Sequence, residues 1–427
     1  MLTIRTGSPQ HYCDGVSRRG FLKVGAAGFC GLTLANLLRA EDAAGIGSSS
    51  KAIINIHLGG GPSHQDIFDL KPSAPVEFRG EFNPIATNVP GLEICEHLPK
   101  LAQMAEKFAV IRSLVGSNAG HSNFQTQSGY NQRSLTNIGG RPSIGSVVAK
   151  LQGANANGAP PFVSYSGGSA GYLGPIYKPF SPNDAKNVLR LNRGLTADRL
   201  SNRTNLLSSL DTIRRDIDSS GQVNALDSYT QRAYEMVTSG EVADALDLKK
   251  EDRNVVDRYS KQGENLLAAR RLIQAGVRVV TLNASWGGWD THNKNFTSLK
   301  TRNLPQMDVS LSALLWDLDR LDLLNDVSVV VWGEFGRTPR VNSRGGRDHW
   351  PKLSMAFLAG GGMKTGQAVG ASTKYAEYAK DRPVDYQEVH ATLYRNLGID
   401  CESTTIIDPN GRPQYLLDYR NPIGELV

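Results

Sequence analysis

Carboxylates and imidazoles recur in this sequence at short spacings that suit metal binding. Asp290 and His292 are two residues apart, so in an extended loop both side chains project to the same side and can share one ion. His64 and Asp66 repeat that spacing. Imidazole and carboxylate together are the ligand set of zinc and similar divalent ions. Our candidate metal ligands are His64, Asp66, Asp290, His292, Glu334, Asp348 and His349.

These groups are numerous enough for one or two divalent ions, with zinc as the first candidate and manganese or calcium as alternatives. A metal pair suits phosphoryl or sulfuryl transfer, because it can stabilise both the attacking and the leaving oxygen. Arg337 could then clamp the oxyanion with two parallel hydrogen bonds. The pattern therefore favours ester hydrolysis.

Ordinary structural roles remain open for the same motifs. His64 and Asp66 follow a glycine-rich loop, where they could form a helix cap or an Asx turn. Asp290 could cap a turn. Glu334 could merely pair with Arg337 in an exposed salt bridge, although it directly follows four apolar residues.

The other histidines are also open to structural interpretations. Asp348 and His349 on their own could belong to a surface turn. His57 lies inside an apolar strand, which favours a hydrogen-bonded core histidine. His97 and His390 lie in helical surroundings, and we expect both to be structural.

Short apolar runs precede most of the candidate ligands. We expect core strands at residues 53–58, 108–114, 277–283, 329–332 and 353–362, and helices near 255–274, 307–324 and 384–399. Helices that alternate with fully apolar strands favour an α/β fold, in which a parallel sheet is covered on both faces. Ligands bind beyond the carboxyl ends of such strands, so separate loops would bring the polar groups to one edge.

Composition narrows the class of protein. A chain of 427 residues with 40% hydrophobic residues can bury a substantial core, as one large domain or two smaller ones. The net charge of +6 comes with no dense run of lysine or arginine, so nothing points to nucleic acid as a partner. Cys95 and Cys401 could form at most one disulfide, and neither lies in the motif that type I sulfatases convert to formylglycine.

The N-terminus carries a targeting pattern. The twin arginine of "SRRGFLK" at 17–23 precedes an uncharged stretch at 24–38, which is typical of a bacterial twin-arginine signal and too short for a stable membrane span. We expect residues 1–44 to be a signal peptide and leader, and the protein to be periplasmic or otherwise exported. The export machinery is then one partner.

A polar segment at residues 181–275 has leucine, arginine, aspartate and alanine at helical spacing. Because it lies between core strands, we expect a largely helical insertion. Such an insertion would act as a cap that shapes the entrance to the pocket.

Four motifs together resemble a known family. They are "GGGPSHQDIFDLKP" at 59–72, "GWDTHNKNF" at 288–296, "VVVWGEFGRTPRVN" at 329–342 and "GRDHWP" at 346–351. Their order is similar to that in exported bacterial proteins grouped as domain of unknown function 1501, in the alkaline phosphatase-like superfamily, from about residue 51 to the C-terminus. The resemblance implies an α/β/α sandwich with a mainly parallel sheet and a metal site at its carboxyl edge, as in phosphatases and arylsulfatases.

The chain departs from the superfamily pattern at two strand ends. Superfamily hydrolases usually place an Asp directly after the first strand and an Asp-His pair after a late one. Here the first strand runs into glycines, and Glu334 follows the late strand. The resemblance therefore implies that the ligands are reassigned to His64 with Asp66, and to Asp348 with His349.

The resemblance also implies a nucleophile at a helix start beside the metals. The loop at 116–129 offers Ser122, which we choose because it adjoins His121, and we expect both Ser122 and His121 to be catalytic. The same loop also offers Ser117, Thr126 and Ser128.

Two functions follow from these observations. The first is a periplasmic, metal-dependent hydrolase of small-molecule or polysaccharide phosphate or sulfate esters, in which Ser122 or a water attacks and Arg337 steadies the transferring group. In it, Asp290, His292 and His349 hold one ion, and His64, Asp66 and Glu334 help to hold a second. The second is a non-catalytic exported binding or envelope-assembly protein that keeps the fold.

Overall fold

The computed structural model describes residues 51–155, 159–182 and 240–427. The predicted signal peptide and most of the predicted insertion, residues 183–239, lie outside the described residues. Among the helices of the described part, none is both long and apolar enough to cross a membrane.

An eight-stranded sheet forms the centre of the fold, in the order β11-β4-β10-β7-β1-β6-β5, with β14 pairing with β4. The strands are β1 Ala52–His57, β4 Phe108–Val115, β5 Phe162–Ser164, β6 Val279–Asn283, β7 Val327–Trp332, β10 Ser354–Gly360, β11 Gln367–Val369 and β14 Val384–Asp385. Strand β10 is antiparallel to β4 and β7, and the other pairings within this sheet are parallel. The predicted α/β class with a mainly parallel sheet is confirmed.

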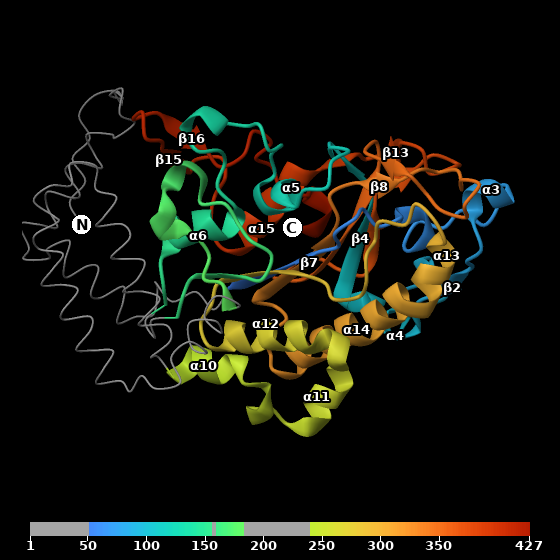
Figure 1. Ribbon diagram of the computed structural model, residues 1–427, viewed down its shortest axis with the longest axis horizontal. Helices are drawn as coiled ribbons and strands as arrows, with labels where there is room; N and C mark the ends of the chain where they lie inside the picture. The colour runs from blue at the N-terminus through green and yellow to red at the C-terminus, as the bar shows by residue number, and fades with distance from the viewer. Residues whose placement is uncertain (1–50, 156–158, 183–239) are drawn as a thin grey trace, which may run out of the picture. The chain divides into compact units, whose positions relative to one another are not determined.

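Helices cover both faces of the sheet (Figure 1). Ile54 and Ile56 of β1 belong to the hydrophobic cluster that contains α12 (Glu264–Gln274) and α14 (Leu304–Arg320). Ile53, between them, belongs to a second cluster with α6 (Ile144–Gln152) and α15 (Tyr386–Asn396). Successive side chains of a strand point to opposite faces, so an all-apolar strand is buried on both sides.

Smaller elements complete the described chain. Four two-stranded sheets are β2–β3 (Pro84–Ala86, Glu93–Cys95), β8–β9 (Gly336–Arg337, His349–Trp350), β12–β13 (Ala371–Ser372, Ala379–Asp381) and β15–β16 (Thr405–Ile407, Pro413–Tyr415). The short helices include α3 (Val76–Arg79), α4 (Pro99–Ala102), α5 (Phe124–Ser128) and α13 (Asn295–Ser298). A π-helical turn at Leu299–Asn303 joins α13 to α14. Cys95 and Cys401 are both buried and free, in different hydrophobic clusters.

The described end of the predicted insertion forms three helices, α10 (Gly240–Leu246), α11 (Arg253–Tyr259) and α12. A single helix was expected near 255–274, but Ser260 has a positive φ of 58° and separates α11 from α12. Helix α12 contacts β1, β6 and α14. This part of the segment therefore belongs to one of the helical layers on the sheet.

Candidate metal centre

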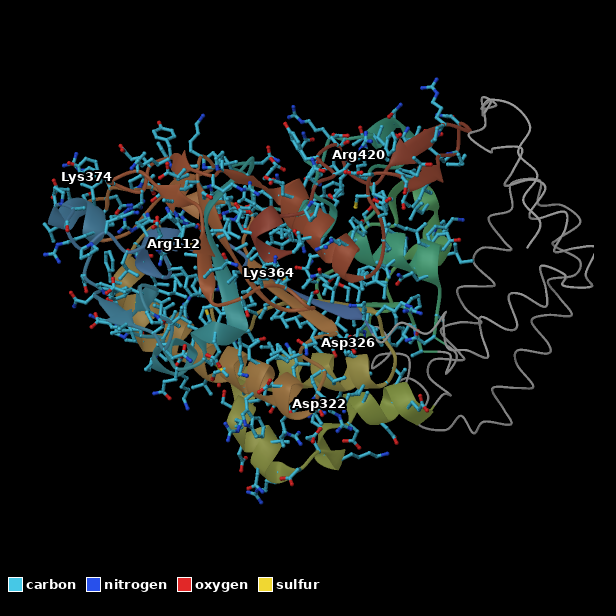
Figure 2. All side chains as sticks on the ribbon, turned by 180° about the vertical axis from the view of Figure 1, so that it is seen from behind. Arg112, Asp322, Asp326, Lys364, Lys374 and Arg420 are labelled. Atoms are coloured by element: carbon cyan, nitrogen blue, oxygen red, sulfur yellow. The ribbon has the colours of Figure 1, made fainter. Side chains whose placement is uncertain are left out.

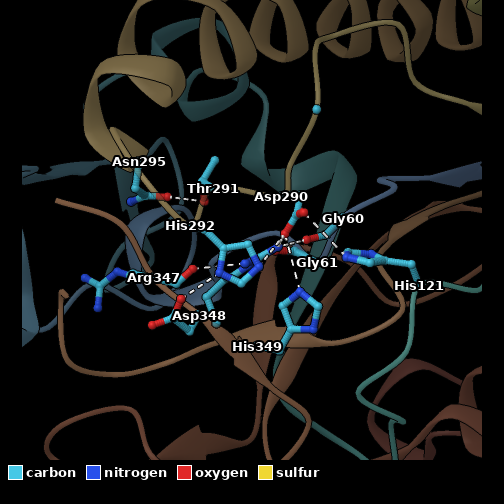
Figure 3. Close-up of polar contacts among 12 residues, drawn as sticks. Gly60, Gly61, His121, Asp290, Thr291, His292, Asn295, Arg347, Asp348 and His349 are labelled. Atoms are coloured by element: carbon cyan, nitrogen blue, oxygen red, sulfur yellow. Dashed lines mark hydrogen bonds and ion pairs between the residues drawn. The ribbon is translucent and has the colours of Figure 1, made fainter. Parts of the chain in front are cut away.

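Four loops meet at the carboxyl ends of the central strands. His121 follows β4, Asp290 and His292 follow β6, and Glu334 follows β7. The hairpin β8–β9, in which Arg337 pairs with His349, brings a further imidazole to the same place. The predicted convergence of separate loops at one edge of the sheet is therefore what the structure shows (Figure 3).

Three imidazoles surround the carboxylate of Asp290 (Figure 3). The Nε2 atom of His292 lies 3.1 Å from Oδ1 of Asp290, and that of His349 lies 3.4 Å from the same oxygen. The Nε2 atom of His121 lies 3.5 Å from Oδ2. Zinc bonds of 2.0–2.1 Å place neighbouring ligands of a tetrahedral site about 3.3 Å apart. Ligand atoms of His121, Asp290 and His349 all lie within 4.8 Å of one another, so these three residues are close enough to share one ion, and His292 adjoins the group through Asp290.

The opposite nitrogen of each imidazole is held by an acceptor. His121 Nδ1 donates to Glu334 Oε1 at 3.0 Å, and His292 Nδ1 donates to Asp348 Oδ1 at 2.6 Å. His349 Nδ1 donates to the carbonyl oxygen of Ala119 at 2.9 Å. A carboxylate or carbonyl cannot donate, so each ring carries its proton on Nδ1.

This arrangement brings the Nε2 lone pairs of the rings close to the negatively charged carboxylate of Asp290, which is electrostatically unfavourable. In a neutral imidazole that is protonated on Nδ1, the Nε2 lone pair points at the carboxylate of Asp290. A proton on each Nε2, or one metal cation among them, removes this repulsion. Metal-bound histidines commonly donate their second N–H to a carboxylate or carbonyl, as these three do. The donor set therefore fits a divalent ion.

Glu334 lies behind the imidazoles and is only 3% exposed. Its carboxylate accepts hydrogen bonds from the backbone N–H groups of Gly60 and Gly61 at 2.8 and 3.3 Å. Gly60 has a φ of 115°, and a Cβ there would lie 2.4 Å from the backbone nitrogen of Asp290. The glycines after β1 thus permit close approach of two loops, and Glu334 positions His121 instead of joining the inner ligands.

Asp348 has the same supporting relation to His292. Its second oxygen accepts from the side chain of Asn342 at 3.2 Å. The hydrogen bond from His292 is the main reason that the pKa of Asp348 lies below its ordinary value. Both carboxylates that were expected to be direct ligands, Glu334 and Asp348, instead hold a ligand imidazole.

Arg337 differs from the predicted oxyanion clamp. Its side chain is 0% exposed and donates to the carbonyl oxygens of Gly60, Gly61 and Arg347, and to Oδ1 of Asp290. Burial acts to raise the pKa of Asp290, but the hydrogen bond and charge of Arg337 outweigh it and lower that pKa. Arg337 is therefore closed off from solvent by the protein, and it keeps Asp290 ionised.

Asp66 lies apart from the cluster. Arg347, fully buried, donates from Nε and Nη2 to the two oxygens of Asp66, both at 2.8 Å. Ser63 and Asn295 also donate to Asp66 Oδ2. The carboxylate of Asp66 is thus saturated by protein donors, which explains why it is not among the inner groups.

Like Asp66, His64 has no hydrogen bond or ion pair with Asp290 among the described residues. The residue is fully buried, and neither ring nitrogen has a hydrogen-bond partner among the described residues. Burial lowers the pKa of His64 to about 4. The pair that was expected to hold a second ion therefore belongs to the interior beneath the site.

A cavity of about 540 Å³ opens over the cluster. It is lined by His57, Gly59, Gly60, His121, Ser122, Asn123, Asn283, Asp290 and Glu334. His57 is buried, with 4% of its surface exposed, and its Nδ1 lies 3.1 Å from the hydroxyl of Thr126, so the expected hydrogen-bonded core histidine is confirmed. His57 also lines the cavity, with its Nε2 3.5 Å from Glu334, which was not expected. Its place as the last residue of β1, at the carboxyl edge, was the available signal.

Ser122 differs from the other candidate nucleophiles. The hydroxyls of Ser117, Thr126 and Ser128 donate to backbone carbonyl oxygens. The hydroxyl oxygen of Ser122 accepts from the backbone N–H of Phe124 at 3.2 Å, and within the described chain its own proton has no acceptor. Ser122 lines the cavity together with His121.

The chain belongs to the family described as "protein of unknown function (DUF1501)", whose model matches residues 50–427. No curated protein matches it significantly. Among solved structures, it is similar to Ps i-CgsB in complex with k-i-k-neocarrahexaose, with 11% identity, a TM-score of 0.37 and coverage of 82% of this chain and 72% of that one. For the PsFucS1 sulfatase from Pseudoalteromonas sp., the values are 9%, 0.36, 86% and 72%. Likeness at this level identifies neither a substrate nor a mechanism for this chain.

Proposed function

We propose that this member of the DUF1501 family is an exported, metal-dependent hydrolase of phosphate or sulfate esters. The observation that carries the proposal is the meeting of three imidazole Nε2 atoms at the carboxylate of Asp290, each ring fixed from behind through Nδ1. An imidazole-rich site in a solvent-open cavity is the usual form of a catalytic zinc centre.

The charges favour one ion over two. Asp290, Glu334 and Asp348 contribute three negative charges, and Arg337 contributes one positive charge. One divalent ion would balance the remainder, whereas a second would leave an excess of positive charge at a half-buried site. Imidazole nitrogens favour zinc over calcium or manganese, which prefer oxygen ligands.

In the proposed site, His121, His292, His349 and Asp290 hold the ion. A bound zinc ion acts as a Lewis acid toward an ester oxygen. Ser122, whose hydroxyl proton is uncommitted, or a water in the cavity supplies the attacking oxygen. Arg337 holds Asp290 in place and ionised from below.

The architecture supports placing the chain in the alkaline phosphatase-like superfamily as part of this proposal. The sheet is mainly parallel, helices cover both of its faces, and the polar groups gather at its carboxyl edge. The twin arginine at 18–19 supports periplasmic localisation through the corresponding export machinery.

The test is metal content together with ester hydrolysis, measured on protein purified from the exported fraction without chelators. We expect about one zinc per chain, and chelator-sensitive turnover of 4-nitrophenyl phosphate or sulfate. Asp290→Asn should lose the ion and at least about 100-fold of the turnover, because a ligand and its charge are removed. Asp322→Asn is the matched control, since Asp322 lies just beyond the end of α14 (Figure 2).

Two results would contradict the proposal. If Asp290→Asn kept both its metal and its turnover, the cluster would not be the site. If wild-type protein bound zinc tightly but hydrolysed neither ester class, the chain would be a binding or envelope-assembly protein with a structural metal.

A further inference from the structure

Two further cavities adjoin the metal cavity, and we call the three together the groove. The second cavity, of about 440 Å³, shares Ser122 and Glu334 with the metal cavity. The third, of about 540 Å³, shares Ser122 with both and Phe124 and Gln132 with the second. Ser122 is therefore the residue at which all three cavities meet.

The lining of the second and third cavities suits a ligand with many hydroxyl groups. Carboxamides, which both donate and accept hydrogen bonds, are unusually frequent there. They are Asn118, Asn123, Gln125, Gln127, Asn131 and Gln132. The half-buried ring of Phe124 adds an apolar surface of the kind on which a sugar ring can lie.

The charge of this part of the groove is positive. Arg133 lines the second cavity and Lys178 lines the third. Both are exposed, and within the described chain neither charged group has a hydrogen-bond or ion partner. Glu334 is the one carboxylate among the described lining residues, and it is almost fully buried. Two free cations at successive positions suit a ligand with repeated negative charges.

We propose that this groove binds an anionic oligosaccharide. The ester that is cleaved at the metal centre then belongs to one sugar of a longer sulfated or phosphorylated chain, whose neighbouring sugars lie along the carboxamides. This inference rests on the ester hydrolysis proposed above and names its class of substrate. It also gives Arg133 and Lys178 a role, as contacts to the ester groups of neighbouring sugars.

A single-stranded nucleic acid would fit the groove less well. Grooves for such ligands combine a dense row of cations with several aromatic rings on which the bases stack. Here the described lining offers two cations and the ring of Phe124. Gln125 and Gln127 are buried and bonded to backbone carbonyls within the protein. Asn118, Asn131 and Gln132 are exposed, and these are the carboxamides that can meet sugar hydroxyls.

Competition binding tests the proposal on full-length exported protein supplemented with zinc. The probe is a fluorescent chondroitin sulfate hexasaccharide, displaced by unlabelled di- and hexasaccharides. We expect the hexasaccharide to compete at least about 10-fold better than the disaccharide, and a desulfated hexasaccharide to compete correspondingly worse. The double variant Arg133→Ala with Lys178→Ala should lose most of this advantage while its turnover of 4-nitrophenyl esters stays unchanged.

The matched control is Arg253→Ala with Lys261→Ala, which removes two exposed cations at α11 and the turn that follows it. The control should keep the full length dependence. Equal competition by both lengths, an unchanged advantage in the groove variant, or equal competition by single-stranded DNA of the same charge would overturn the inference.

The result separates the two proposals. Length-dependent binding without release of sulfate or phosphate would leave the groove assignment intact and overturn ester hydrolysis. Turnover of small aryl esters without length-dependent binding would support ester hydrolysis and overturn the groove assignment.

Discussion

Two segments of this chain combine histidine and aspartate at the same spacing and use them in opposite ways. Asp290 lines a cavity, and the side chains of Asp290 and His292 are 44% and 35% exposed. His64 and Asp66 are buried, and Asp66 is closed off by the two-point contact with Arg347. The same spacing therefore has different surroundings: His64 and Asp66 lie in a short 3-10 helix in the interior, whereas Asp290 and His292 lie in a loop at the carboxyl edge of the sheet.

Asp66 of the buried pair nevertheless supports the loop that carries the exposed pair, Asp290 and His292. Asn295 donates to Asp66 at 2.8 Å and accepts from the hydroxyl of Thr291 at 2.6 Å. Thr291 stands between Asp290 and His292, so the buried network fixes the loop that carries both. The buried carboxylate of Asp66 therefore fixes the loop, and the exposed Asp290 and His292 offer their polar atoms to a ligand.

Removal of the buried carboxylate should have the largest effect on stability. Asp66→Asn leaves the buried guanidinium of Arg347 without a countercharge, which costs about 3–5 kcal/mol of unfolding free energy. Denaturant unfolding of metal-free protein measures this loss. Asp290→Asn should lose less, because Asp290 is 44% exposed and solvent screens its interaction with Arg337, whereas both partners of the Asp66–Arg347 pair are fully buried. Equal losses in the two variants would refute the distinction.

The buried His64 should make the free energy of unfolding depend on pH. Its folded-state pKa of about 4 lies below the unfolded value of 6.5, so the unfolded chain takes up a proton first as the pH falls. The stabilising contribution of neutral His64 is complete above pH 6.5 and is lost as the pH falls toward 4. The loss amounts to about 3 kcal/mol.

The comparison with His64→Leu isolates this contribution, because leucine keeps an apolar side chain at the site and cannot titrate. Unfolding free energies measured between pH 7 and pH 4 should fall less steeply in the variant than in the wild type. Parallel pH profiles for the two proteins would show that His64 is not buried as a neutral ring.

The smallest predicted effect on stability is that of replacing Asp348, which accepts a hydrogen bond from His292. Asp348→Asn should weaken zinc binding by about 10–100-fold, because His292 loses the carboxylate that orients its ring. Chelator competition measures the affinity. The stability of metal-free protein should change little, since the side chain of Asp348 is 46% exposed. An unchanged zinc affinity would mean that His292 does not bind the ion.

Much of the scaffold was predictable from the sequence. Fully apolar runs predicted the core strands, and the capping-box pair Asp385 and Glu388 begins the helix that was expected near 384–399. The antiparallel direction of β10 was not predictable, because strand direction depends on the path of the connecting chain.

The inner and outer groups of the site could be only partly separated by sequence. Their spacing predicted that Asp290 and His292 lie together. It could not show that Glu334 and Asp348 accept hydrogen bonds from His121 and His292. The partner of Asp66 is 281 residues away, and no local pattern links the two. His57 was correctly assigned to the core from its apolar strand, but its place at the strand end, beside the cavity, was not used.

Asp66 and Arg347 are separated by 281 positions in the chain, which sets an order of events during synthesis. The hydrogen bonds between them cannot form until the ribosome has passed Arg347, and His349 emerges two residues later. A nascent chain therefore lacks the complete set of side chains of the candidate site while most of it is being made. Any ion that needs the whole set would be bound only by a nearly finished chain.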